Sequence, residues 1–260
     1  MTLPPATDGT SPGLLRFRGA DAAKFLQGQL SNDMTALDAD RLLLAGLHNA
    51  QGRVLALLRL VAPAPDDVIA LLPAELAEPI AAQLRRFVLR ARLTIVNESA
   101  VDAMGAAAAA VPALAAALRD DSRAAGVAAG LPQVYAATSG EFVSQMLNLD
   151  CIDAISFNKG CYTGQEIIAR AHYRGRMKRR MQRFVSAAEQ ALTPGQPIRL
   201  GDGRTARVVD AALRADGRTE FLAVTALSAP GSDEMPETTA GASETRVDCS
   251  ALPLPYALPE

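Results

Sequence analysis

Short β-like runs and helical patterns alternate over the first 97 residues, and this alternation restricts the possible folds more than any other feature. Residues 14–18 predict a short strand that ends at a glycine. Asp21 is then the predicted N-cap of a helix whose apolar residues Phe25, Leu26 and Leu30 fall on one face. A strand followed directly by an amphipathic helix is the usual opening of a layered α and β fold.

Further runs continue the same pattern. Apolar runs at 42–49 and 53–62 are separated by a Gln-Gly pair that suits a hairpin turn, and residues 68–72 predict another strand. A helical pattern at 74–90 and a strand at 93–97 follow. This order matches the split βαβ plan of ferredoxin-like domains, so we expect an α+β fold.

Two further regions follow residue 97, an alanine-rich one and a β-rich C-terminal one. Residues 98–130 are rich in alanine and predict a helix at 103–119, with a break between two subdomains in this region. After residue 182, short β-like runs with Gly and Pro turns predict a small C-terminal β-barrel at 183–260, which leaves an α+β module at 1–182. Within the barrel, residues 228–244 are predicted to form a loop, because they are rich in Ser, Thr, Pro, Gly and acids.

Composition excludes several classes of protein. Apolar residues make up 49% and charged residues 21% of the 260, which is ordinary for a globular protein. No apolar run reaches the roughly 18 residues of a spanning helix, and the N-terminus lacks a signal-peptide pattern, so we expect a cytoplasmic protein without membrane contact. The three cysteines form no CxxC pair, and we expect free thiols and no metal site.

The densest signal for chemistry is FNKGCYTGQEIIARAHYRGRMKRRM, residues 157–181. Thr163 and Glu166 have the spacing of a capping box, which predicts a helix over 164–171. Cys161 would then lie in the turn before this helix, where free N–H groups and the nearby Lys159 favour a thiolate. The segment therefore predicts a reactive, redox-active or ligand-forming thiol.

Two other readings of Cys161 stay open. A lone cysteine is more often a small buried apolar residue than a reactive one. A Cys-His dyad with His172 would give a thiol hydrolase, but His172 lies beyond the predicted helix. At 1.5 Å per residue the helix separates the two side chains by about 10 Å or more. A direct hydrogen bond between them is not expected.

Residues 170–183 form a basic strip with seven cations and no acid, although the net charge of the chain is −2. Such a strip is either an ordinary solvated face or an anchor for carboxylates and phosphates, to which arginine is suited. Because the chain as a whole is acidic, direct nucleic-acid binding is not expected. The members of the basic strip are Arg170, Arg174, Arg176, Lys178, Arg179, Arg180 and Arg183.

The motif KGCYTGQE at 159–166 resembles the signature of the YgfZ family, which is related to the glycine-cleavage T-protein. Eight consecutive matching positions make the resemblance specific, and further similar segments in the same order extend it over most of the chain. These are GADAAKFLQGQLSND (19–33), QGRVLALLRL (51–60), LPQVYAATSGEFVSQMLNL (131–149), ARAHYRGRMKRR (169–180) and LPLPYALPE (252–260).

The resemblance implies a folate-binding α+β module with a C-terminal β-barrel, and tetrahydrofolate or a one-carbon derivative as cofactor. It also implies support of iron–sulfur client enzymes, including tRNA-modifying ones. Cys161 is the implied functional residue, acting as a redox thiol or as a transient ligand of iron or sulfur. We expect the folate to contact Gln27, Asn32, Lys159, Tyr162, Gln165, Glu166, Arg170, Arg174 and Lys178.

The sequence departs from the family pattern at several points. The chain has no tryptophan, so pterin stacking must fall to another residue. The stretch before Gly130 carries no acid, and Ser144 stands where a proline is usual.

Two other functions stay open beside the family's. An aminomethyltransferase needs a carboxylate by the reacting amine, and no Asp or Glu occurs between His48 and Leu60, so we do not expect a conventional enzyme. A non-catalytic scaffold would dock an acidic partner or RNA through the basic strip.

Overall fold

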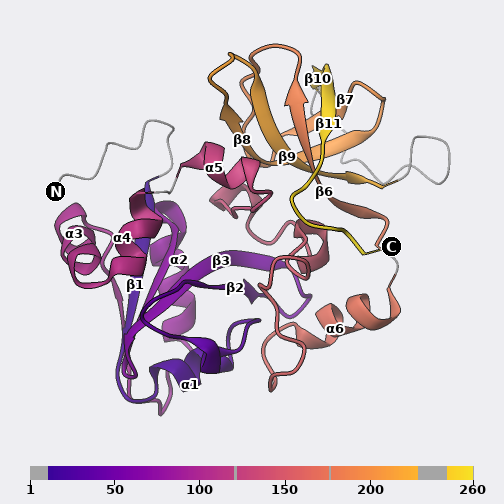
Figure 1. Ribbon diagram of the computed structural model, residues 1–260. Helices are drawn as coiled ribbons and strands as arrows, with labels where there is room; N and C mark the ends of the chain where they lie inside the picture. The colour runs from indigo at the N-terminus through magenta and orange to yellow at the C-terminus, as the bar shows by residue number, and fades with distance from the viewer. Residues whose placement is uncertain (1–10, 120–121, 176, 228–244, 260) are drawn as a thin grey trace. The chain divides into compact units, whose positions relative to one another are not determined.

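The computed structural model describes residues 11–119, 122–175, 177–227 and 245–259 (Figure 1). The chain forms two compact units. Unit 1 takes in the chain up to residue 121 together with Val134–Ser144 and Asp153–Arg170. Unit 2 contains Ser122–Gln133, Gln145–Ile152 and the chain from Ala171 onward. The chain thus passes between the units several times.

Unit 1 is built on a five-stranded antiparallel sheet in the order β2-β3-β4-β1-β5. The strands β1, β3, β4 and β5 have the order of a ferredoxin-like sheet, as predicted, and β2 adds a fifth strand through its hairpin with β3. The strands are β1 (Pro12–Arg18), β2 (Leu43–His48), β3 (Val54–Ala64), β4 (Asp67–Pro73) and β5 (Thr94–Asn97).

Helices cover both faces of this sheet (Figure 1). Gly13 lies directly under α2 (Ala74–Arg85), because a Cβ at this glycine would come within 3.1 Å of the Ala77 Cβ. The neighbouring Leu14 points to the other face, where it packs with residues of α3 (Val101–Ala110) and α4 (Pro112–Arg119). The helix α1 (Ala22–Gln27) contacts β4.

Two predicted helices differ from the observed ones. The predicted helix at 74–90 ends at Arg85, and residues 86–92 are not helical. The predicted helix at 103–119 is broken at Val111, because Pro112 has no N–H group to continue the hydrogen bonding of α3 and starts α4.

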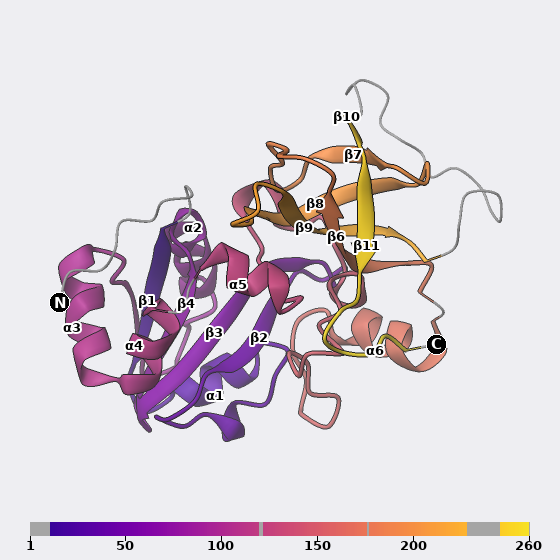
Figure 2. The same ribbon diagram turned by 45° about the horizontal axis from the view of Figure 1, so that its top comes forward.

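Unit 2 contains a six-stranded sheet in the order β10-β7-β8-β9-β6-β11, curled into a half-barrel (Figure 2). Its pairs are antiparallel except for β10 with β7. The strands are β6 (Arg179–Ser186), β7 (Pro197–Leu200), β8 (Thr205–Leu213), β9 (Thr219–Ala226), β10 (Thr245–Val247) and β11 (Cys249–Leu252). The predicted loop at 228–244 lies outside the described residues.

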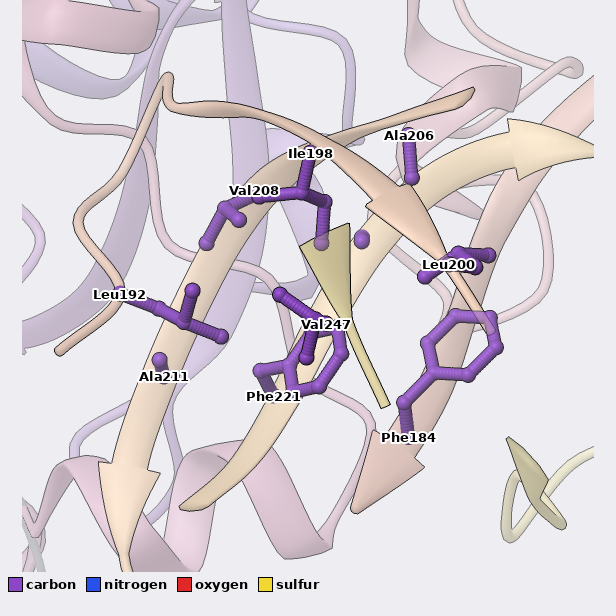
Figure 3. Close-up of a cluster of buried hydrophobic side chains, with 10 residues drawn as sticks. Phe184, Leu192, Ile198, Leu200, Ala206, Val208, Ala211, Phe221 and Val247 are labelled. Atoms are coloured by element: carbon purple, nitrogen blue, oxygen red, sulfur yellow. The ribbon is translucent and has the colours of Figure 1, made fainter. Parts of the chain in front are cut away.

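The inner face of the half-barrel holds the core of unit 2 (Figure 3). Phe184 of β6 and Phe221 of β9 stack at this core with their ring centroids 5.4 Å apart. The helix α5 (Arg123–Ala128) packs against β8 and β9, and Arg123 Nε donates a hydrogen bond to the buried Asp210 carboxylate of β8.

The helix α6 (Gln165–Arg174) carries part of the predicted site. Three short 3-10 helices complete the secondary structure: η1 (Met34–Ala36), η2 (Ala136–Thr138) and η3 (Ser144–Leu147). In the part of the chain that the structure describes, none of the helices has both the length and the apolar character needed to cross a membrane.

Candidate functional site

The residues that lead into the motif are tied to the connection between α1 and β2. The Ser31 hydroxyl donates to the Ala154 carbonyl over 2.7 Å and accepts from the Gly46 N–H over 2.8 Å. The Asn32 side-chain amide donates to the Asp153 carbonyl over 2.6 Å and to the Leu44 carbonyl over 2.7 Å. The motif therefore begins from a fixed backbone position.

Lys159 anchors the motif in the same connection. Its ammonium donates to the backbone carbonyls of Gln27, Leu30 and Asn32, each over 2.7 Å. These three bonds use all three N–H groups of the ammonium, and Lys159 is only 9% exposed. Burial lowers the pKa of Lys159 to about 8, while the Asp33 carboxylate acts in the opposite direction. The side chain therefore stays protonated at neutral pH and fixes the turn.

Cys161 and Tyr162 face opposite environments although they are adjacent. Cys161 is exposed, so the reading of this residue as a small buried apolar side chain is wrong. Tyr162 is 7% exposed, and burial raises the pKa of its phenol to about 12. The Lys159 ammonium lies 5.2 Å from the centre of the Tyr162 ring. The turn thus presents one thiol to solvent between two buried anchors.

The start of α6 differs from the predicted capping box. The helix begins at Gln165, and within the described residues neither the Thr163 nor the Glu166 side chain makes a capping hydrogen bond. Gly164 precedes the helix with φ of +82° and lies against the β2–β3 turn, where an added Cβ would approach the Asn49 carbonyl oxygen to 2.6 Å. This close approach requires glycine and determines where the helix begins.

A buried polar pair, which the sequence analysis missed, lies at the end of β2. His48 Nε2 and the Ser144 hydroxyl are 2.6 Å apart, and both side chains are almost fully buried. Among the described residues, His48 Nδ1 is buried without a hydrogen-bond partner. Burial lowers the pKa of His48 to about 4, and its ring centre lies 6.2 Å from that of Tyr162. The only sequence signal for this pair was a histidine at the end of an apolar run.

Three of the predicted folate contacts make hydrogen bonds within unit 1. Gln27 accepts from the Met34 N–H and donates to Asp33, and Asn32 is fully bonded to backbone groups. The Lys159 ammonium is used by the three carbonyls. All three side chains hold the connection after α1 together, and we do not carry them forward as ligand contacts.

The basic strip does not act as one surface. Arg180 makes a bidentate ion pair with the buried Asp150, with both N···O distances at 2.9 Å, and Arg183 pairs with Glu220. Both arginines lie on β6, and their ion-pair partners belong to unit 2. Arg170 and Arg174 on α6 are exposed, as is Lys178.

The other two cysteines lie in less reactive surroundings. Cys151 is half-buried beside the Asp150–Arg180 pair, and burial together with the Asp150 carboxylate raises its pKa to about 11. Burial likewise raises the pKa of Cys249. His172 lies in the last turn of α6, where its ring meets Tyr173 edge to face at 4.8 Å. Within the described residues, no three His, Cys, Asp or Glu side chains are grouped to hold a metal ion.

The chain is similar along most of its length to proteins named tRNA-modifying protein YgfZ. It is 29% identical to the protein of Sodalis glossinidius and 28% identical to that of Serratia proteamaculans. The identity to the protein of Escherichia coli SMS-3-5 is 26%. Each comparison covers 95% of this chain and 91% of the relative. No protein-family model matches the chain.

A solved structure has a similar fold. The glycine cleavage system aminomethyltransferase T from Bartonella henselae has a similar fold, with a TM-score of 0.61 and 16% identity over 84% of this chain and 76% of that one. The similarity to the YgfZ proteins extends over 95% of the chain and therefore includes residues of both units. The motif at 159–166 forms the anchored turn that exposes Cys161. The comparisons confirm that the chain resembles the YgfZ family over most of its length.

Proposed function

We propose that the chain binds tetrahydrofolate and supports the assembly or repair of iron–sulfur enzymes, including tRNA-modifying ones, with Cys161 as the acting thiol. The observation that carries this proposal is the exposed Cys161 in a turn held by the buried Lys159 and Tyr162. A thiol presented by a fixed backbone is suited to repeated, directed chemistry, because little conformational entropy is lost when a partner approaches.

The comparisons support the two halves of this proposal to different degrees. The relatives are named tRNA-modifying proteins, which supports a role connected with tRNA modification. The similarity to an aminomethyltransferase concerns the fold alone. The proposal that the chain binds folate rests on the resemblance of the motif to the family. The iron–sulfur clients are likewise part of the family expectation.

The remaining side chains fit a folate by their chemistry. Glu166 is exposed and, within the described residues, has no side-chain partner, so its carboxylate can accept from the N–H edge of a pterin. Arg170 and Arg174, also exposed, are suited to the glutamate carboxylates, and we keep Gln165 and Lys178 as candidate polar contacts.

Tyr162 is the aromatic residue of the motif in a chain without tryptophan; it is 7% exposed, and its ring centre lies 6.2 Å from that of His48. Bound tetrahydrofolate would supply a carrier for one-carbon groups.

The β2–β3 turn argues against the aminomethyltransferase alternative. The β2–β3 turn contains no Asp or Glu, and the Asn49 side-chain oxygen accepts from the N–H groups of Gln51 and Arg53. This oxygen therefore stabilises the turn and is already used. Without a carboxylate, the turn has no group to position or deprotonate a reacting amine.

Calorimetric titration with tetrahydrofolate under anaerobic conditions tests the cofactor. We expect a dissociation constant on the order of micromolar. Arg170→Glu should weaken binding about tenfold through charge repulsion, whereas Arg90→Glu is the matched control, since it makes the same change at an exposed arginine outside the motif. No heat of binding, or equal weakening in both variants, would contradict the folate proposal.

A further inference from the structure

An exposed basic and apolar surface lies in unit 1, outside the candidate functional site. The segment RRFVLRAR, residues 85–92, follows α2, and no Asp or Glu occurs between Glu78 and Glu98. Phe87 is 53% exposed and Leu89 is 87% exposed. Single exposed apolar residues are common, but here two large ones lie within a run of four arginines.

Only two of the four arginines are used within the unit. Arg85 Nη1 pairs with the Glu78 carboxylate at 2.6 Å, and Arg85 Nε donates to the Ile95 carbonyl. Arg92 pairs with Asp21 at 3.3 Å. Among the residues that the structure describes, Arg86 and Arg90 have neither a hydrogen-bond nor an ion-pair partner for their side chains. These two guanidinium groups flank Phe87 and Leu89 in the sequence.

Backbone hydrogen bonds fix the segment at both ends. The N–H groups of Arg86, Phe87 and Val88 continue from the last turn of α2 to carbonyls three residues earlier. At the other end, the Arg92 N–H donates to the Asp21 carboxylate over 2.8 Å. The apolar side chains are therefore displayed on an ordered backbone, and a partner that binds there does not have to order it.

We propose that Arg86, Phe87, Leu89 and Arg90 form a docking surface for an acidic, amphipathic segment of a partner protein. The partner's apolar side chains contact Phe87 and Leu89, while its carboxylates accept bidentate hydrogen bonds from Arg86 and Arg90. Arginine and aromatic residues are the types enriched in protein interfaces, and the segment contains no lysine.

The same features argue against RNA as the occupant. Two available cations neutralise few phosphates, so the electrostatic part of RNA binding would be small. Phe87 could stack on a base, but RNA offers no counterpart for the almost fully exposed Leu89. An aliphatic side chain between two arginines is best matched by a protein segment with apolar residues bordered by acids.

Fluorescence anisotropy with a defined probe tests this surface. The probe is a labelled helical peptide of about 15 residues with a Leu and Phe stripe bordered by Glu, and a permuted peptide of equal composition lacks the stripe. The wild-type protein should bind the striped peptide at least about tenfold more tightly than the permuted one. Arg86→Glu/Arg90→Glu and Phe87→Ala/Leu89→Ala should each lose about tenfold or more in affinity.

Charge reversal gives the sharpest result. A striped peptide with Lys in place of Glu should bind Arg86→Glu/Arg90→Glu more tightly than it binds the wild type, since the ion pairs are restored with opposite sign. Arg246→Glu, at an exposed arginine of β10, is the control that should leave peptide binding unchanged. Tetrahydrofolate binding by the double variants should also be unchanged, which separates this surface from the folate proposal.

Three results would overturn the docking surface. Equal binding of the striped and permuted peptides would exclude recognition of an amphipathic segment. Unchanged binding by both double variants would place the peptide elsewhere on the protein. Loss of binding to bulk tRNA in the same variants, with no peptide binding by the wild type, would assign the surface to RNA.

Discussion

Replacement of Lys159 by methionine removes the ammonium that holds the motif while keeping the length and apolar stem of the side chain. Three backbone carbonyls, of Gln27, Leu30 and Asn32, lose their donor in this variant. A buried acceptor without a donor costs about 1–2 kcal/mol, so the gross loss is about 3–6 kcal/mol. Because the variant no longer buries a charge, part of this loss is recovered, and we expect a net destabilisation of about 2–3 kcal/mol.

Urea unfolding followed by circular dichroism measures this loss. Lys24→Met is the matched control, because Lys24 is an exposed lysine of α1 in the same unit and the charge change is identical. We expect the control to stay within about 0.5 kcal/mol of the wild type. If Lys159→Met is as stable as Lys24→Met, the three carbonyls do not depend on the ammonium, and the anchoring role of Lys159 is refuted.

Three further predictions concern the motif and the residues around it. Gly164→Ala should destabilise the protein by at least about 1 kcal/mol in urea unfolding, because an added Cβ would meet a backbone oxygen at 2.6 Å. Gly160→Ala is the control and should be neutral, because a Cβ added there would have no atom within 4 Å. Equal effects of the two changes would contradict the packing of this turn. Iodoacetamide at pH 7.5 should modify the exposed Cys161 at least about tenfold faster than the half-buried Cys151, whose pKa is raised to about 11. Peptide mass mapping measures the two rates, and equal rates would contradict the exposures of the two thiols. Burial lowers the pKa of His48 from 6.5 to about 4, so this residue is neutral in the folded protein at neutral pH. As the pH falls, the unfolded chain takes up a proton on His48 before the folded protein does. About 3 kcal/mol of folding stability should therefore be lost between pH 6.5 and a pH below 4. This acid-induced loss, measured by urea unfolding at each pH, should be absent in His48→Gln, and an identical pH dependence in both proteins would contradict it.

The sheet of unit 1 could be predicted from the sequence because its signals are local. The apolar runs and the Gln51-Gly52 turn indicated the strands and their order in the chain. The helix boundaries were less predictable, since Pro112 breaks one predicted helix and Arg85 ends another early. A periodic pattern does not indicate where tertiary contacts end a helix.

The anchoring of the site could not be predicted, because its partners are distant in the sequence. Lys159 bonds to carbonyls 127 to 132 residues away, and a carbonyl leaves no signal in a sequence. The capping box failed for a similar reason, since the position of Gly164 depends on the β2–β3 turn. Arg180 was assigned to a basic strip because its partner Asp150 lies 30 residues earlier.

The central claim is that Cys161 is the thiol through which the protein acts, and complementation tests it most directly. A bacterial strain that lacks its own YgfZ-family protein receives the wild-type chain, Cys161→Ser, or Cys249→Ser as the matched control. The readout is the activity of iron–sulfur enzymes, measured as the fraction of thiolated nucleosides in tRNA by mass spectrometry. We expect the wild type and Cys249→Ser to restore this fraction and Cys161→Ser to leave it at the level of the empty vector, although the variant is folded. Full restoration by Cys161→Ser would contradict the account.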